Sequence, residues 1–132
     1  MSRIVSLPKL ESLIIEDLEN ITDDIFDAMP NLRDLDCSYC PKLRNAGLAR
    51  LVRNSDRIEH IYMSNCDGIT NDFLHAAIKA TKKRKSNVVL KLHASYTDVK
   101  YDEARDSSPF LLVIPIIVIS FAEMDGQMVM EF

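Results

Sequence analysis

The sequence contains few of the residues on which common ligand-binding and catalytic motifs depend. It has only 3 glycines in 132 residues, so it lacks a glycine-rich loop of the kind that wraps phosphate groups. Its 3 cysteines cannot all pair in disulfides, and such a number is typical of reduced, buried thiols inside cells. The first residues contain no apolar segment long enough for a signal peptide. These absences predict a cytoplasmic or nuclear protein.

The charge balance excludes another class of function. The formal net charge is −4, whereas general nucleic-acid binding needs a basic face that neutralises phosphates. We therefore expect no nucleic-acid partner. A hydrophobic content of 47% beside 27% charged residues is ordinary for a globular protein, and the length suffices for one compact core.

Long apolar runs are also missing. The longest is FLLVIPIIVISFA at residues 110–122, which Pro115 interrupts. Thirteen residues are too few to cross a bilayer as a helix, so the sequence predicts no membrane span.

What the sequence does contain is a repeat. Three stretches align without gaps, at residues 10–23, 32–45 and 58–71, and a weaker fourth copy begins at residue 89. Each full copy fits the pattern apolar-x-x-apolar-x-apolar-x-x-Cys/Leu-x-x-Ile/Leu. The equivalent residues Leu13, Leu35, Ile61 and Leu92 are 22, 26 and 31 positions apart. A unit of this size cannot bury its own apolar face, but stacked copies can.

The pattern predicts an α/β fold, a leucine-rich repeat solenoid arc of about four strand–helix units. Alternating apolar residues predict short strands centred near 13, 35, 61 and 92 in one parallel sheet. Helices are expected over 71–82, capped by Thr70 or Asn71, and after Asn45, which is expected to cap its helix. A third, short helix is expected around 22–29 and ends before Pro30.

The repeats decay after residue 99, which suggests two parts. We assign residues 1–106 to a leucine-rich repeat domain and residues 107–132 to an apolar C-terminal cap or tail. Residues 108–111 are candidates to open a fifth strand. The apolar stretch is expected to pack on the last repeat, to bind a partner or to promote aggregation, and sequence that is not native to the fold, such as an alternative exon, stays open as a further explanation.

Cys37 and Cys40 form a C-x-x-C pair, for which two interpretations compete. Zinc sites use this spacing, but they need a second ligand pair, and only Cys66 follows, with His60 and His75 at poor spacings. Repeat packing places Cys37 on an inward strand position and Cys40 in the turn. We therefore expect no metal and no cofactor, with Cys37 and Cys66 buried.

Two copies with the cysteine in register, LRDLDCSYCPKL at 32–43 and IYMSNCDGITN at 61–71, resemble the cysteine-containing leucine-rich repeats of F-box/leucine-rich-repeat proteins. The resemblance covers about residues 7–100. It implies parallel strands on a concave face, helices on the convex face, and capture of a target protein by the repeats. In that family a separate F-box segment binds the adaptor of a ubiquitin ligase.

If this register is right, the outward strand positions form the partner-binding face. They are Ser12, Ile14 and Glu16 on the first strand, Asp34, Asp36 and Ser38 on the second, His60, Tyr62 and Ser64 on the third, and Lys91 and His93 on the fourth. Tyr62 beside His60 has the character of an interface anchor, although solvated strand residues would give the same pattern. The Asp34 and Asp36 pair suits an acidic patch for a basic partner better than a metal or catalytic site, because no third acidic ligand completes it.

The basic run Lys-Lys-Arg-Lys at residues 82–85 also has two interpretations. The functional interpretation is a nuclear import signal or a segment that contacts an acidic partner. The structural interpretation is a charged helix C-terminus, where the helix dipole favours cations.

These observations predict a non-enzymatic protein–protein interaction module, with target recognition in a ubiquitin-ligase system as one form of it. The alternative is a structural or assembly factor of a larger complex that docks through the apolar C-terminal tail.

Overall fold

Five short parallel strands form the sheet around which the chain is built. They are β1 (Ser12–Ile14), β2 (Asp34–Asp36), β3 (His60–Tyr62), β4 (Leu90–His93) and β5 (Leu111–Ile114), in that order across the sheet. The computed structural model describes residues 9–23, 26, 29–97, 99, 108–114, 118–121 and 128–131. The four strand centres predicted from the repeat, and their parallel arrangement in one sheet, are confirmed.

The register of the sheet follows the sequence repeat. Leu13 pairs with Leu35, Leu35 with Ile61, Ile61 with Leu92, and Leu92 with Val113. Except for the half-buried Leu13 on the edge strand, these residues are buried. One apolar residue per strand therefore stacks on the next and forms a continuous ladder through the core.

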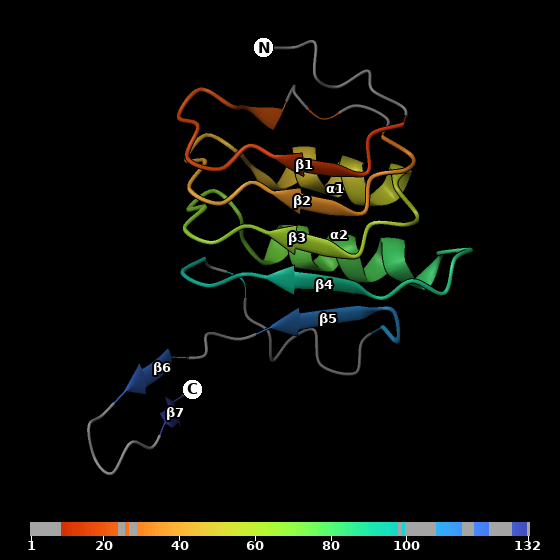
Figure 1. Ribbon diagram of the computed structural model, residues 1–132. Helices are drawn as coiled ribbons and strands as arrows, with labels where there is room; N and C mark the ends of the chain where they lie inside the picture. The colour runs from red at the N-terminus through yellow and green to blue at the C-terminus, as the bar shows by residue number, and fades with distance from the viewer. Residues whose placement is uncertain are drawn as a thin grey trace.

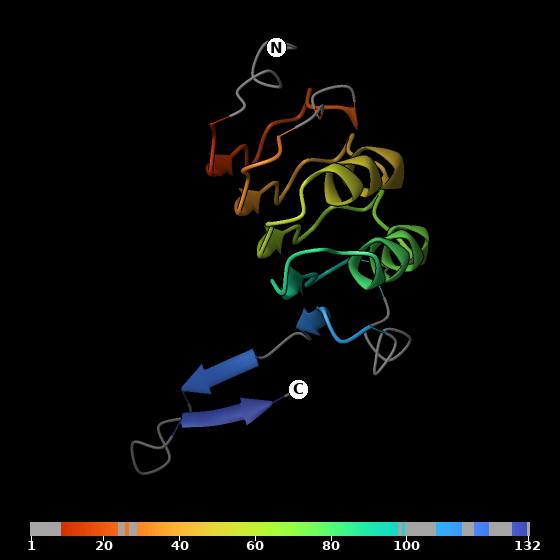
Figure 2. The ribbon, with the colours of Figure 1, turned by 90° about the vertical axis from the view of Figure 1, so that its right-hand side faces the viewer.

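Two helices cover one face of this sheet. They are α1 (Asn45–Asn54) between β2 and β3, and α2 (Asn71–Lys82) between β3 and β4. Figure 1 shows both helices behind the strands, and Figure 2 shows the strands and the helices as two layers. Leu48, Leu51 and Val52 of α1 are buried, as are Phe73, Leu74 and Ala77 of α2, because these residues recur at the spacing of one helix face.

The two helix starts differ in how well the sequence predicted them. Thr70 caps α2, with its side-chain oxygen accepting a hydrogen bond from the Asp72 N–H. The expectation that Asn45 caps α1 is wrong, because Asn45 is the first helical residue and Arg44 holds the cap position without a side-chain bond. The Asn45 amide instead bonds both the backbone N–H and the hydroxyl of Thr70, and so ties the starts of the two helices together.

The turn after each strand has the same backbone shape in four successive layers. Asp17, Tyr39, Asn65 and Tyr96 have φ between 58° and 60°, and their spacing of 22, 26 and 31 residues equals that of the strands. The N–H groups of the first three donate to the carbonyls of Ser38, Ser64 and Ser95 in the next layer, over 2.8–3.0 Å. The hydrogen-bonded stack therefore continues past the strands into the turns.

The predicted fifth strand is present, so the sheet continues past residue 106 into the segment assigned as cap or tail. β5 pairs with β4 over four residues, and Leu111 and Val113 are buried. Beyond it, β6 (Val118–Phe121) and β7 (Met128–Glu131) form a separate antiparallel pair. Of the short helix expected at 22–29, only residues 22, 23, 26 and 29 are described, so this prediction lies largely outside the described residues.

Candidate functional site

The face of the sheet opposite the helices carries two rows of side chains in register. One row runs Ser12, Asp34, His60, Lys91, Leu112, and the other runs Ile14, Asp36, Tyr62, His93, Ile114. We call these ten residues the sheet face. Every one of them is exposed or half-buried, and no described element packs over them (Figure 2). Side chains from five strands thus share one open surface.

Three rings form a stacked cluster at the middle of the sheet face. The rings of Tyr62 and His93 lie nearly parallel, 4.1 Å apart between centroids. His60 stacks beside both, at 5.8 Å from Tyr62 and 5.4 Å from His93. Tyr62 keeps 38% of its surface exposed. A ring held in place by its neighbours loses little conformational freedom on contact with a partner, which suits an interface anchor.

A hydrogen bond joins the two histidines of this cluster. Nδ1 of His60 lies 3.1 Å from Nε2 of His93, so one nitrogen donates and the other accepts. Burial lowers the pKa of His93, and the nearby His60 and Lys91 lower it further. The neutral form of His93 is therefore favoured, which preserves an acceptor for this bond.

An acidic hollow lies beside the rings. A cavity of about 250 Å³ opens between β1, β2 and β3 and is lined by Ser12, Leu13, Ile14, Asp34, Leu35, Asp36 and Tyr62. Both aspartates are half-buried, and Oδ1 of Asp36 accepts the Ser38 N–H at 3.0 Å. The hollow therefore offers two carboxylates beside Tyr62 and Ile14, and Ile14 is 70% exposed.

Three residues predicted for this face lie in the turns after the strands instead. Glu16 is exposed there, and Ser64 is half-buried. The expectation that Ser38 points outward is not met: its side chain is only 6% exposed, and its oxygen accepts the Ser64 N–H at 3.2 Å. Contacts with the turns on both sides explain this, because the Asp17 N–H donates to the Ser38 carbonyl and the Ser64 N–H donates to the Ser38 hydroxyl oxygen.

Two residues of the sheet face were missed by the sequence pattern. Leu112 and Ile114 extend the two rows onto β5, and Leu112 is 49% exposed. The signal was present, since residues 108–111 were recognised as a possible strand opening. The alternation of buried and exposed positions could not be recognised in this almost wholly apolar sequence, because inward and outward positions carry the same kind of residue.

The three cysteines are buried and serve the packing of the layers. The thiol of Cys40 donates to the carbonyl oxygen of Ile15 at 3.0 Å, and the thiol of Cys66 donates to that of Cys37 at 3.1 Å. The hydrogen bond with Cys66, together with burial, raises the pKa of Cys37 well above its ordinary value, and burial raises that of Cys40. The hydrogen bond with Cys37 has the opposite effect on Cys66 and lowers its pKa to about 7. Burial keeps all three thiols away from solvent, and an inaccessible thiol is a poor nucleophile.

Within the described residues, no three histidine, cysteine, aspartate or glutamate side chains come together as metal ligands would. The same part of the chain contains no helix of the length and apolarity needed to cross a membrane.

Comparisons with known proteins assign no family to this chain. No protein-family model matches the sequence, and neither the curated proteins nor the solved structures contain a significant match.

Proposed function

We propose that the chain is a leucine-rich-repeat type interaction module that binds a protein partner on its sheet face and catalyses no reaction. The observation that carries this proposal is the open face itself. Two rows of five side chains, with a stacked ring cluster at the centre, are held on one rigid sheet. An ordered surface with an aromatic centre and a charged surround has the composition of a binding site.

Equivalent contacts in successive layers support the assignment to this repeat class. Cys40 and Cys66 occupy the same place in two copies, and each thiol donates to the carbonyl of the equivalent residue one layer earlier. A small residue with a donor fits this crowded turn better than a larger apolar one. The left-handed turn residue recurs at the same position in four layers.

The distribution of charge suggests the character of the partner. Carboxylates from Asp34 and Asp36 lie on the β2 side of the rings, and Lys91 lies on the β4 side. A partner segment with a basic group beside an apolar or aromatic side chain would satisfy the hollow and the rings together. Target recognition in a ubiquitin-ligase system, in the cytoplasm or nucleus, is the form of this function that the repeat resemblance favours.

The test is affinity purification of the tagged chain from cells with quantitative mass spectrometry. The sheet-face variant combines Asp34→Arg with Tyr62→Ala. Its matched control, Glu19→Arg with Tyr39→Ala, changes one exposed carboxylate and one exposed tyrosine in turns outside the sheet face. Circular dichroism and a melting curve establish that each variant is folded. The proposal predicts that specific partners are lost from the sheet-face variant and kept by the control, and equal capture by both variants would contradict it.

The second candidate is an assembly factor that docks through its apolar C-terminal tail. The apolar sequence VISF of β6, outside the five-stranded sheet, favours it, whereas Leu111 and Val113 of β5 already face the core. A chain ending at residue 114 separates the two candidates, because it keeps β5 and the sheet face. Partners that bind the sheet face remain with this shorter chain, whereas partners that bind the tail are lost.

A further inference from the structure

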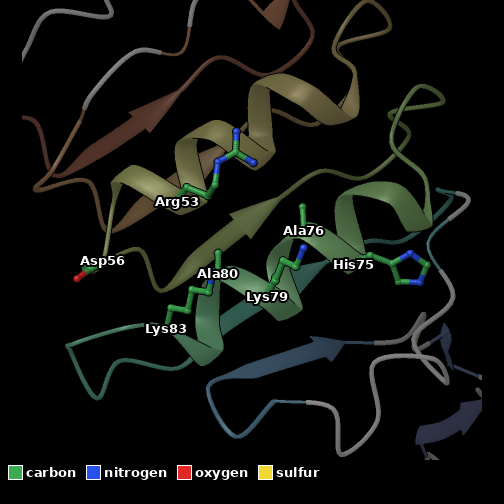
Figure 3. Close-up of a pocket in the computed structure, with 7 residues that line it drawn as sticks. All are labelled: Arg53, Asp56, His75, Ala76, Lys79, Ala80 and Lys83. Atoms are coloured by element: carbon green, nitrogen blue, oxygen red, sulfur yellow. The ribbon is translucent and has the colours of Figure 1, made fainter.

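A second candidate site lies in the helical layer, on the side of the molecule away from the sheet face. A cavity of about 480 Å³ opens between the C-terminal halves of α1 and α2. Figure 3 shows its lining: Arg53 and Asp56 from α1 and the loop after it, and Ala76, Lys79, Ala80 and Lys83 from α2 and its C-cap, with His75 at the far end of the group. We call this space the helix groove.

The helix groove is basic. Arg53, Lys79 and Lys83 are exposed, and Asp56 is the single carboxylate in the lining. Among the described residues none of the three cations takes part in an ion pair, since the one salt bridge there joins Arg33 to Glu11. Three cations against one carboxylate leave a local positive charge on a chain whose formal net charge is −4, so this groove attracts anions that the rest of the molecule repels.

The floor of the groove is apolar. Ala76 and Ala80 are one turn apart on α2 and half-buried, and they lie at the edge of the helix face through which Phe73, Leu74 and Ala77 enter the core. Alanine side chains leave room where larger residues would close the space between the helices. The cations therefore stand around a surface that apolar side chains of a ligand can contact.

From this arrangement we infer that the helix groove binds an acidic peptide segment of a partner protein. Lys79 and Lys83 are spaced by about 6 Å along α2, and Arg53 lines the same cavity from α1 (Figure 3). This distribution suits several carboxylates spread along a peptide better than one phosphate group. The volume accommodates a few side chains, and the alanine floor gives a peptide apolar contact that a free anion does not use.

The acidic chain as a whole disfavours the other large anions. Nucleic acids and anionic membranes are bound through broad basic surfaces, whereas the positive region here consists of the three cations of the groove and the adjacent, exposed Lys82 and Lys85, on a chain of net charge −4. Because the groove and the sheet face lie on opposite layers (Figure 2), an acidic segment in the groove leaves the sheet face free. The inference is therefore independent of the partner proposed for the sheet face.

The test measures fluorescence anisotropy of a labelled decapeptide of glutamate and alanine with the full chain, at an ionic strength of about 0.15 M. The groove variant is Lys79→Glu with Lys83→Glu. Its control is Lys82→Glu with Lys85→Glu, which makes the same charge change at exposed residues that do not line the groove. A third variant, Ala80→Met, fills the floor without altering charge. Circular dichroism checks that all three are folded.

We expect the groove variant to weaken peptide binding roughly tenfold or more, because two attractions become repulsions, and Ala80→Met to weaken it severalfold. The control should stay within about threefold of the parent chain. A decapeptide of lysine and alanine should not bind. The inference is overturned if the acidic peptide does not bind, if both double variants lose affinity equally, or if inorganic phosphate or a single-stranded DNA oligonucleotide binds as tightly as the peptide.

Discussion

At the scale of single residues, the cysteine of each turn contributes a contact that the repeat pattern alone does not specify. The pattern allows Cys or Leu at this position, and the first layer has Leu18, which is 38% exposed. In the next two layers the cysteines are fully buried, and their thiols reach a carbonyl oxygen of the preceding layer. A leucine supplies no such donor. Leu18 belongs to the layer of β1 at the edge of the sheet, whereas the two cysteines belong to interior layers, and this explains their different exposure.

We therefore expect Cys66→Ala to lower the free energy of unfolding by roughly 1–3 kcal/mol, through loss of the hydrogen bond and of packing volume. Leu18→Ala is the matched control at the equivalent position, and it should cost less than about 1 kcal/mol because its side chain is partly solvated. Urea denaturation measures both. Equal losses would mean that the buried thiol does not stabilise the stack.

The histidine pair makes a prediction about pH. Because burial, and then the nearby His60 and Lys91, lower the pKa of His93, the unfolded chain takes up this proton first as the pH falls. Stability should fall as the pH drops through about 6.5, the ordinary value for histidine, and should level off below the pKa of the folded state. His93→Phe keeps a ring against Tyr62 but cannot be protonated.

Thermal melts between pH 8 and pH 5 test this. Between those limits the melting temperature of the parent chain should fall further than that of His93→Phe. His60, Lys91 and the carboxylates of Asp34 and Asp36 are present in both proteins, so the difference isolates His93. If both proteins lose the same stability on acidification, His93 is not the group responsible.

At the scale of secondary-structure elements, the repeat predicted the strands better than the connections between them. An apolar residue every second position fixes which face of a strand is buried, so Leu35 and Ile61 could be placed without a structure. The start of α1 could not be placed in this way, because the Asn45 side chain can either cap α1 or form hydrogen bonds with another layer. It does the latter, with Thr70, and no local sequence feature identifies a residue 25 positions away as the partner.

The sheet face shows the same limit. Positions within strands could be predicted, but the burial of Ser38 just beyond β2 could not, because it comes from contacts with the turns of the neighbouring layers. The turn itself is also hard to predict from the sequence, because Tyr39 has a positive φ of 59° and tyrosine is uncommon in the left-handed conformation. The same left-handed conformation recurs at the equivalent Asp17 and Asn65, and both residue types tolerate it. Alignment of the repeats therefore gives a clue to the turn at Tyr39.

The turns of adjacent layers also lie very close together at Gly68. A Cβ atom built at this position would overlap the carbonyl oxygen of Leu43 and the side chain of Arg44. We expect Gly68→Ala to cost about 1–3 kcal/mol, as overpacking does, although alanine is ordinarily the easier residue to order. Urea denaturation of Gly68→Ala tests this, and Ala46→Gly, at an exposed position of α1, gives the ordinary cost of exchanging the two residues. Unchanged or increased stability of Gly68→Ala would show that the layers can separate without cost.

The fifth strand makes a prediction about truncation. Leu111 and Val113 are buried, and the Ser108 hydroxyl is 2.8 Å from that of Thr81. A chain ending at residue 107 loses these contacts and exposes β4, so it should be destabilised by roughly 3 kcal/mol or more. A chain ending at residue 114 keeps them and should melt within a few degrees of the full chain. If the two truncated chains are equally stable, β5 does not close the core.

At the scale of the whole molecule, the five strands differ in how firmly they are held. Each layer contacts only its neighbours, and in such a stack stability is the sum of layer and interface contributions. The interior residues Leu35, Ile61 and Leu92 are fully buried, whereas Leu13 on β1 is only half-buried and lies between the exposed Ser12 and Ile14. Among the strands that the structure describes, β1 pairs with β2 alone, so opening β1 breaks one interface, and opening β3 breaks two.

Amide hydrogen exchange should therefore give a graded pattern, with the slowest exchange in β3 and its neighbours and faster exchange in β1. The N–H of Ile61 should be among the most protected, because β3 is hydrogen-bonded to strands on both sides. Leu35→Ala should accelerate exchange in β1 more than in β4, since it weakens the interface that β1 depends on. Mass spectrometry of the exchanged chain after pepsin digestion resolves these segments. Equal exchange in all strands would mean that the sheet opens as one cooperative unit. A binding partner would then slow exchange in all five strands equally, and not only in the layers that it contacts.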